Sequence, residues 1–343
     1  MKHSLSSPGT AQPRPVSAWT IARPFGTRTL IALLLAMAVL YSAGQRVEMG
    51  RMLALSGEGL MAAVGLRETS QVSSGMAGIA RSLFPIQISE STAVARIENF
   101  DRQYLPLFSH VEEVVTHELR LNPQTLEMQD TVGRQEVLIQ PVGYLWHVLV
   151  KMLETLEIAL WATLLAVVLS LPLAWFSARN YTPNRLCYGL ARGLVSMFRA
   201  VPELVSALLL VLAYGFGPIA GVLALALHSA GFLGKFYAED IETADDKPQE
   251  ALRAIGASKL KVMRYAVLPQ VVPQFIAYTL YVLDRNVRMA TVVGLVGAGG
   301  IGQELKGRYD MYNYAHVGTI LVAIFLTVFV LDQIAARLRR GVA

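Results

Sequence analysis

The residues whose types and spacing point most directly to chemistry are the glycines of TVVGLVGAGGIGQE, residues 291–304. Gly297, Gly299 and Gly302 reproduce the G-x-G-x-x-G spacing that, between a strand and a helix, cradles the pyrophosphate of a dinucleotide. Such a site also needs an acidic residue about 20 residues further on, at the end of a second strand. The corresponding region here is the apolar run 316–330, and the acidic residue after it is Asp332. A membrane-bound oxidoreductase is therefore disfavoured, and the glycines need another explanation.

Composition indicates an integral membrane protein. The chain has 343 residues, of which 54% are hydrophobic and only 16% are charged, outside the usual range of soluble domains. A single cysteine, Cys187, excludes a disulfide within the chain and a multi-cysteine metal site. The net charge of +5 matters less than where the charges lie.

Apolar runs predict about six membrane-spanning helices, since a helix needs about 20 apolar residues to cross the hydrocarbon core. The predicted spans are 29–44, 156–176, 187–214 with an interruption at Pro202, 218–239, 267–286 and 317–336.

Basic residues favour the cytoplasmic side of a membrane. They gather at 1–28, around 179–185, within 240–266 and after 336, which fall on one side of a chain with about six spans. We therefore expect both termini in the cytoplasm and an uncleaved anchor at 29–44, with a cleaved signal peptide as the alternative.

Residues 45–150 then form an extracytoplasmic insertion. We expect this insertion to be mostly helical, because apolar residues recur with a helical period around Val111, Val114, Val115 and Leu119.

Ionisable residues at membrane depth are costly and usually face a partner or a wet pathway. We expect Arg199 and His228, with Arg285 or Arg288 nearer the outer mouth, to lower the barrier for an oxyanion in transit. In the alternative, Arg199 pairs with Glu203 one turn on, Arg285 pairs with Asp284 or an external carboxylate, and His228 bonds a neighbouring helix. The candidate pathway residues are Arg199, Glu203, His228, Arg285, Arg288 and Thr291.

The glycines of 291–304 fit a turn at this pathway. Glycine lets backbones approach closely, and irregular backbone at membrane depth is tolerated where it is buried or lines a cavity. We expect a gate or re-entrant turn made of Gly294, Gly297, Gly299, Gly300 and Gly302.

The loop between the fourth and fifth predicted spans, 243–269, is the one long internal loop with its own pattern. Asp245 and Asp246 can cap a helix, and Pro248 suits its first turn. Gly256 ends or bends this helix before a second short one at 257–265. Apolar residues on such a unit, outside the membrane, favour docking of a cytoplasmic partner.

This loop resembles the EAA loop of binding-protein-dependent ABC importer permeases. The matching residues are Glu250, Ala251, Gly256, Leu268 and Pro269. Leu252 stands where a second alanine is frequent, and Ala266 where isoleucine is common. The segments 154–180, 198–205, 221–242 and 286–305 resemble the phosphonate-type permeases in particular, so that the resemblance covers roughly 150–340.

The resemblance implies a type I permease domain at 151–340, an all-α integral membrane fold with a core of five helices plus the N-terminal anchor. It implies a homodimer in the bacterial inner membrane, surrounded by lipid, with two cytoplasmic ATPase subunits and a periplasmic substrate-binding protein. ATP and Mg belong to the ATPase, and the chain itself has no G-x-x-x-x-G-K-[ST] motif. We therefore expect no enzymatic activity, cofactor, metal or nucleic acid for this chain.

Phosphonate is the expected solute, with phosphite, hypophosphite and methionine as alternatives. An ATP-independent secondary transporter built on inverted repeats is a further alternative. It is disfavoured because no motif recurs and the organised loop at 243–269 would then have no purpose.

Overall fold

The computed structural model describes residues 26–65, 70–98, 100–102, 105–106, 108–121 and 128–342. The chain divides into two compact units, Met1–Gly78 and Ile79–Ala343, and each is described by itself. The predicted basic N-terminus at 1–28 lies outside the described residues except for 26–28.

The first unit is helical where it is described. It contains α1 (Thr27–Arg46), α2 (Met49–Ala63) and the beginning of α3 (Gln71–Leu83). The apolar side chains along α1 are exposed, as expected for a helix whose surroundings are lipid. The predicted apolar segment at 29–44 is thus one continuous helix.

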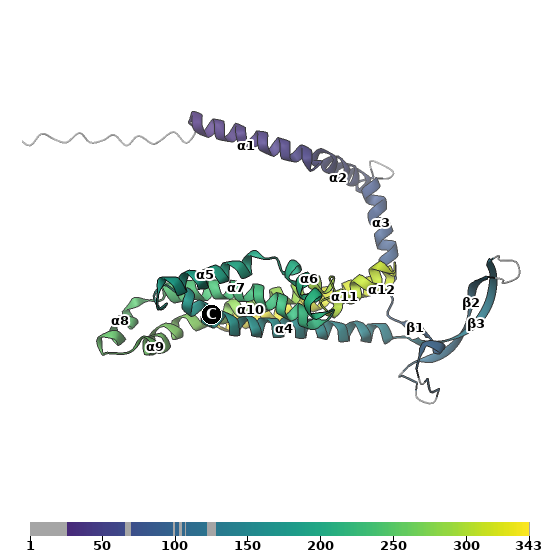
Figure 1. Cartoon of the computed structure of the whole chain (residues 1–343). Coiled ribbons are helices and arrows are strands. Elements are labelled where there is room, and N and C mark those ends of the chain that lie inside the picture. Colours follow the sequence, from purple (N-terminus) through teal and green to yellow (C-terminus); the bar gives the residue numbers. More distant parts are fainter. Residues whose placement is uncertain are drawn as a thin grey trace, which may run out of the picture. The chain divides into compact units, whose positions relative to one another are not determined.

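The second unit contains a bundle of helices (Figure 1). They are α4 (Gly143–Ser177), α5 (Arg185–Ala200), α6 (Glu203–Tyr214), α7 (Pro218–Thr243), α10 (Leu268–Gly294), α11 (Gly300–Asp310) and α12 (Tyr314–Val342). Among the described residues, 5 helices are long and apolar enough to cross a membrane, or up to 6 spans if α5 and α6 form one broken span. The expected fold class is confirmed. The predicted boundary at 150 falls inside α4, which begins earlier than the apolar run does.

Small residues allow α4 and α7 to pack closely along their length. Ala159 and Ala162 of α4 are fully buried in one core cluster with Ala220 and Ala224 of α7, and α10 packs against both helices. Lipid tails are as apolar as leucine, so helices in a membrane associate through close packing of this kind rather than through the hydrophobic effect. These three helices form the frame that positions the polar groups described below.

Proline explains why the third predicted span is broken. Pro202 cannot donate a backbone hydrogen bond, and its ring forces Val201 into an extended conformation (φ −85°, ψ 120°). The helix axis bends by 91° between α5 and α6. Glu203 therefore becomes the first residue of a new helix and no longer lies one turn beyond Arg199 on a common face.

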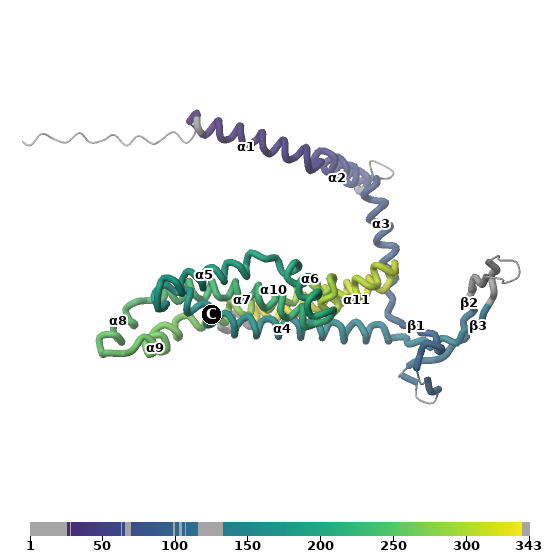
Figure 2. The backbone as a smooth tube through the Cα atoms, viewed as in Figure 1, coloured from purple at the N-terminus to yellow at the C-terminus, as the bar shows by residue number. Residues whose placement is uncertain are grey.

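Two short helices cross the end of the bundle where α7 finishes. They are α8 (Asp246–Ala254) and α9 (Lys259–Val262), followed by a π-helical turn at Met263–Val267 that leads into α10. Figure 2 shows them at the end of the bundle opposite to the β-strands.

A 3-stranded antiparallel sheet lies at the other end, where α4 begins. Its strands are β1 (Glu90–Ala93), β2 (His110–Leu121) and β3 (Met128–Gln140), in the order β1-β3-β2. Glu90 pairs with Gln140, and His110 pairs with Ile139. The backbone amide of Leu145 donates to Ile88 O at 3.2 Å, which ties the sheet to the first turn of α4.

The prediction of a mostly helical insertion at 45–150 is wrong for its second half. The segment around Val111–Leu119 is strand β2, not a helix. Val114 and Val115 point to opposite faces of the strand and both are exposed, so no one-sided burial imposed a period of two on the sequence. The β-branched residues favour a strand. Strand β3 is the next strand along the chain and pairs with β2 in antiparallel fashion, with Leu121 opposite Met128.

A tight turn joins α10 to α11 and accounts for the glycine spacing. Gly297, Gly299 and Gly300 have φ values of 91°, 84° and 69°, conformations that other residues rarely adopt. The segment before the turn is the helix α10 and not a strand, so the G-x-G-x-x-G spacing has no dinucleotide-binding context here.

The other two glycines allow the helices to touch. A Cβ on Gly294 would lie 2.6 Å from Gly299 O, and a Cβ on Gly302 would collide with the carbonyl oxygen of Thr291. We call residues 294–302 the glycine turn. The predicted turn is present, and its glycines are required by backbone angle or by contact.

The contact at Gly302 can be tested by adding one methyl group. Gly302→Ala should force α11 away from α10 and destabilise the protein by about 1–3 kcal/mol. We expect a melting temperature in detergent that is lower by roughly 2–8 °C.

Gly307→Ala is the matched control, because Gly307 lies in the same helix and no atom is within 4 Å of its would-be Cβ. This variant should melt at the same temperature or slightly higher, since alanine stabilises a helix interior by about 0.5–1 kcal/mol. Equal melting of the two variants would contradict the contact argument.

Candidate functional site

Four ionisable side chains gather around one aromatic ring at the break between α5 and α6. They are Arg199, Glu203, His228 and Arg285, which together with Phe232 are called the charged cluster. Arg285 Nη2 donates to Glu203 Oε1, and His228 Nε2 lies 2.9 Å from the same guanidinium nitrogen. Glu203 Oε1 is 3.1 Å from His228 Nε2. The break, α7 and α10 are thereby connected through polar side chains.

Phe232 lies at the centre of the cluster, and sequence reasoning missed it. The guanidinium carbons of Arg199 and Arg285 lie 5.1 Å and 4.8 Å from its ring centroid. An aromatic face attracts such cations most strongly where water is excluded. Its position one turn after His228 on an otherwise apolar helix was the available signal.

The structure changes the ion pairs considered from the sequence. Glu203 pairs with Arg285 and not with Arg199, because the helix is interrupted between them. Asp284 pairs with Arg288 at 2.7 Å, one turn along α10, and not with its neighbour Arg285. Successive residues of a helix point in different directions, so adjacent charges do not meet.

Two predicted pathway residues lie outside the charged cluster. The Arg288 side chain is 46% exposed, and within the described part of the chain its ion pair is with Asp284 on its own helix. The hydroxyl of Thr291 donates to Arg288 O at 2.6 Å and is exposed.

A buried polar triad holds the three framing helices together close to the charged cluster. Asn286 Nδ2 donates to Thr163 Oγ1 at 3.0 Å, and Asn286 Oδ1 accepts from Ser229 Oγ at 3.0 Å. All three side chains are buried, and they come from α10, α4 and α7. Polar side chains of this kind bond across helices in membrane proteins. Asn286 directly follows Arg285, so the triad fixes the part of α10 that carries the arginine.

The glycine turn is fixed to α4 through the first amides of α11. Gly300 N donates to Glu154 Oε1 at 2.9 Å, and Ile301 N donates to Thr155 Oγ1 at 2.8 Å. These amides have no partner inside the helix, and a carboxylate at a helix N-terminus is favourable. A Cβ on Gly300 would lie 2.5 Å from Thr155 Oγ1, which explains why this position has no side chain.

The α8–α9 loop, residues 243–269, is held to the bundle by Gln249, which sequence reasoning also missed. Gln249 is fully buried although it lies in the most polar helix of the loop. Its Oε1 accepts from the Tyr181 hydroxyl at 2.9 Å and from Arg253 Nη2 at 3.2 Å. Burial raises the pKa of the Tyr181 phenol, although Arg253 acts in the opposite direction. Tyr181 thus stays a hydrogen-bond donor, and α8 is tied to the segment between α4 and α5.

The predicted coupling residues differ in what they contact. Glu250 and Ala251 are exposed on α8, and Pro269 is exposed at the start of α10, whereas Leu268 packs against a core cluster. Gly256 has φ 82°, the left-handed conformation that ends α8, and no atom lies within 4 Å of its would-be Cβ.

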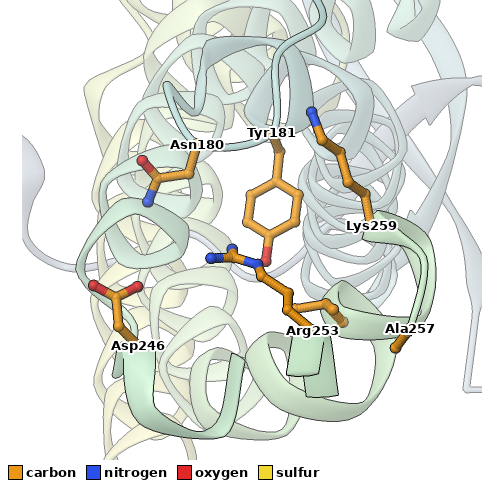
Figure 3. Close-up of a pocket in the computed structure, with 7 residues that line it drawn as sticks. Asn180, Tyr181, Asp246, Arg253, Ala257 and Lys259 are labelled. Carbon is orange, nitrogen blue, oxygen red and sulfur yellow. The ribbon is translucent and has the colours of Figure 1, made fainter. Parts of the chain in front are cut away.

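The loop presents apolar side chains away from the bundle. Ile255 is 80% exposed and Leu260 is 69% exposed, on either side of Gly256. A polar pocket of about 440 Å³ lies beneath them, between the loop and the segment after α4. Figure 3 shows the ring of Tyr181 and the guanidinium group of Arg253 meeting inside this pocket. The exposed apolar residues have no partner among the described residues of the chain.

Comparison with known proteins gives the family. Residues 170–343 match the model of the binding-protein-dependent transport system inner membrane component family. HtxE of Stutzerimonas stutzeri is provisionally named a phosphite transport system permease protein, and it is 60% identical to this chain over 259 residues. The match covers 75% of this chain and 98% of HtxE. The phosphite transport system permease protein PtxC of the same organism is 46% identical over 189 residues, or 55% of this chain and 69% of PtxC.

A solved structure supports the fold independently. A chain of the MetNI methionine ABC transporter, determined in inward-facing conformations, aligns with a TM-score of 0.52 at 23% sequence identity. The alignment covers 58% of this chain and 97% of the transporter chain. The match to the family model and the similarity to HtxE confirm the resemblance seen in the sequence: the chain belongs to the family of binding-protein-dependent transport system inner membrane components, the permease subunits of ABC importers.

Proposed function

We propose that this permease imports a small phosphorus oxyanion, a phosphite or a phosphonate. The observation that carries the proposal is the charged cluster, whose arginines lie at the helix break inside the bundle. A planar guanidinium group can donate two parallel hydrogen bonds to two oxygens of such a tetrahedral anion. The names of HtxE and PtxC favour phosphite, whereas phosphonate was expected from the sequence.

The proposed assembly follows from the family and from the loop. Two ATPase subunits dock on the α8–α9 loops of two permease copies, and a periplasmic binding protein delivers the anion from the other side. The exposed side chains of Ile255 and Leu260 support the loop as the ATPase contact, since apolar side chains exposed outside the membrane mark a site of protein–protein contact. The second copy is proposed to be identical, which makes the permease a homodimer.

The proposed orientation places the α8–α9 loop and both termini in the cytoplasm. Counting α5 and α6 as one broken span gives an even number of crossings, so that the termini lie on one side. The basic residues around 179–185 and 259–264 belong to the same side as the loop and support this choice. The sheet β1–β3 is then extracytoplasmic, and the glycine turn, proposed as a gate, lies toward that face.

The solute can be determined by uptake in cells. A strain without its own phosphonate and phosphite importers should take up phosphite, methylphosphonate or both when it expresses this permease with its ATPase and binding protein. Methionine uptake without uptake of either phosphorus oxyanion would contradict the proposal.

Removing the charge of Arg285 tests the pathway. Arg285→Gln should lower oxyanion uptake at least about tenfold, equivalent to about 1.4 kcal/mol, because the anion loses its guanidinium partner. Lys306→Gln is the control: Lys306 is an exposed cation whose ion pair is with Asp310 on its own helix. If both variants transport like the wild type at equal membrane levels, Arg285 is not in the pathway.

Gly256 tests the coupling loop through its backbone. Gly256→Val should reduce co-purification of the ATPase several-fold, because a β-branched residue is strained at φ 82°. Gly256→Asn is the matched variant, since asparagine tolerates this conformation better, and it should retain most of the ATPase. Equal retention by both variants would show that the conformation at Gly256 does not matter for docking.

A further inference from the structure

Glu203 occupies Arg285, the arginine that the proposed function assigns to the transported oxyanion. One carboxylate oxygen, Oε1, accepts from Arg285 Nη2 and lies 3.1 Å from His228 Nε2. A carboxylate and a phosphorus oxyanion present equivalent acceptors to a guanidinium group. The Glu203 side chain is 11% exposed, so this pair is shielded from bulk water.

His228 connects the helix break to the ion pair of Glu203 and Arg285. Its Nδ1 lies 3.0 Å from Val201 O, which can only accept, so Nδ1 carries a hydrogen. Its Nε2 lies 2.9 Å from Arg285 Nη2, which is a donor, and 3.1 Å from Glu203 Oε1, which is an acceptor. The imidazole ring therefore contacts both members of the ion pair, and in either protonation state it adds no negative charge to the cluster.

The charge balance of the cluster leaves one cation without a counter-ion. Glu203 neutralises Arg285, and Arg199 has no carboxylate partner among the described residues. The Nε of Arg199 is buried without a hydrogen-bond partner in the described part of the chain. Its guanidinium contacts the face of Phe232 instead. A net positive charge shielded from water favours an incoming anion.

Glu203 is also the first residue of α6, immediately after the break at Pro202. Its ion pair with Arg285 therefore fastens the start of α6 to α10, and the bond from His228 to Val201 O fastens the same break to α7. An anion that binds Arg285 in place of Glu203 therefore breaks the connection between α6 and α10.

We infer that Glu203 is an internal competitor of the transported oxyanion for Arg285, and that their exchange couples occupancy of the pathway to the α5–α6 break. This inference rests on the proposed function. Exchange keeps Arg285 paired throughout and so avoids leaving a buried charge alone. The released carboxylate stays at the N-terminus of α6, where the helix dipole favours it. Competition by Glu203 also weakens binding of the anion. Weak binding is needed because a site in a transport pathway has to release the solute.

The test measures anion binding directly. The permease–ATPase complex in lipid nanodiscs, without binding protein, is titrated with radiolabelled methylphosphonate and with phosphite. Glu203→Gln keeps the shape and removes the competing charge, so it should lower the Kd at least tenfold while uptake in cells slows. Arg285→Gln should abolish binding, and the double variant should behave like Arg285→Gln because the gain requires the arginine.

The outcomes separate the inference from the proposed function. A wild-type complex that neither imports nor binds either anion would overturn the proposed function. A wild type that transports, with an unchanged or higher Kd in folded Glu203→Gln, would overturn the competition alone, since a purely structural ion pair predicts no tighter binding. Glu157→Gln, at an exposed carboxylate of α4, is the control and should bind like the wild type. If Glu203→Gln fails to assemble, the Kd is measured for Glu203→Asp instead. The shorter side chain of aspartate competes less for Arg285, so this variant should also lower the Kd.

Discussion

Polar groups inside this bundle have to find their partners within the protein, because a hydrocarbon environment supplies no hydrogen bonds. The rest of the structure depends on this constraint. Where Pro202 interrupts a span, the carbonyl of Val201 loses its helical partner and His228 supplies one. Where α11 begins, its free amides are bonded by Glu154 and Thr155. In both places a polar side chain of another helix bonds the free backbone group, and these side chains connect the helices.

Helix α7 links these irregular places into one frame. Near its start, a Cβ on Gly221 would lie 2.7 Å from Ala298 O in the glycine turn. In its middle, His228 and Phe232 belong to the charged cluster. Near its end, Glu242 accepts from Arg192 at 3.0 Å and from the backbone amide of Arg179 at 2.7 Å, next to the α8–α9 loop. One continuous helix therefore contacts the glycine turn, the charged cluster and the segment that holds the loop.

The sequence predicted what depends on local chemistry and failed where distant partners decide. The apolar runs predicted the long helices, and Pro202 predicted an interruption, since the length of an apolar run and a missing donor are properties of the segment itself. The pairing of Arg199 with Glu203 assumed one helix, which the 91° bend at Pro202 destroys. Strand β2 was missed because Val111, Val114, Val115 and Leu119 also fit a helical period, and because Val114 and Val115, on opposite faces of the strand, are both exposed. Gln249 was missed because nothing in its neighbourhood indicates that a glutamine of a polar helix is buried against Tyr181.

The glycines illustrate how one residue type serves two different physical needs in this chain. Gly302 has an ordinary helical conformation and is required by space, since backbone atoms of α10 lie where its side chain would be. Gly256 is surrounded by empty space and is required by its φ of 82°. At Gly256 the second need arises at a surface that faces away from the bundle. The glycine turn combines both needs, because Gly297 and Gly299 have φ values of 91° and 84° whereas Gly302 is required by space. The G-x-G-x-x-G spacing therefore reflects both the reversal of the chain and the packing of α11 on α10.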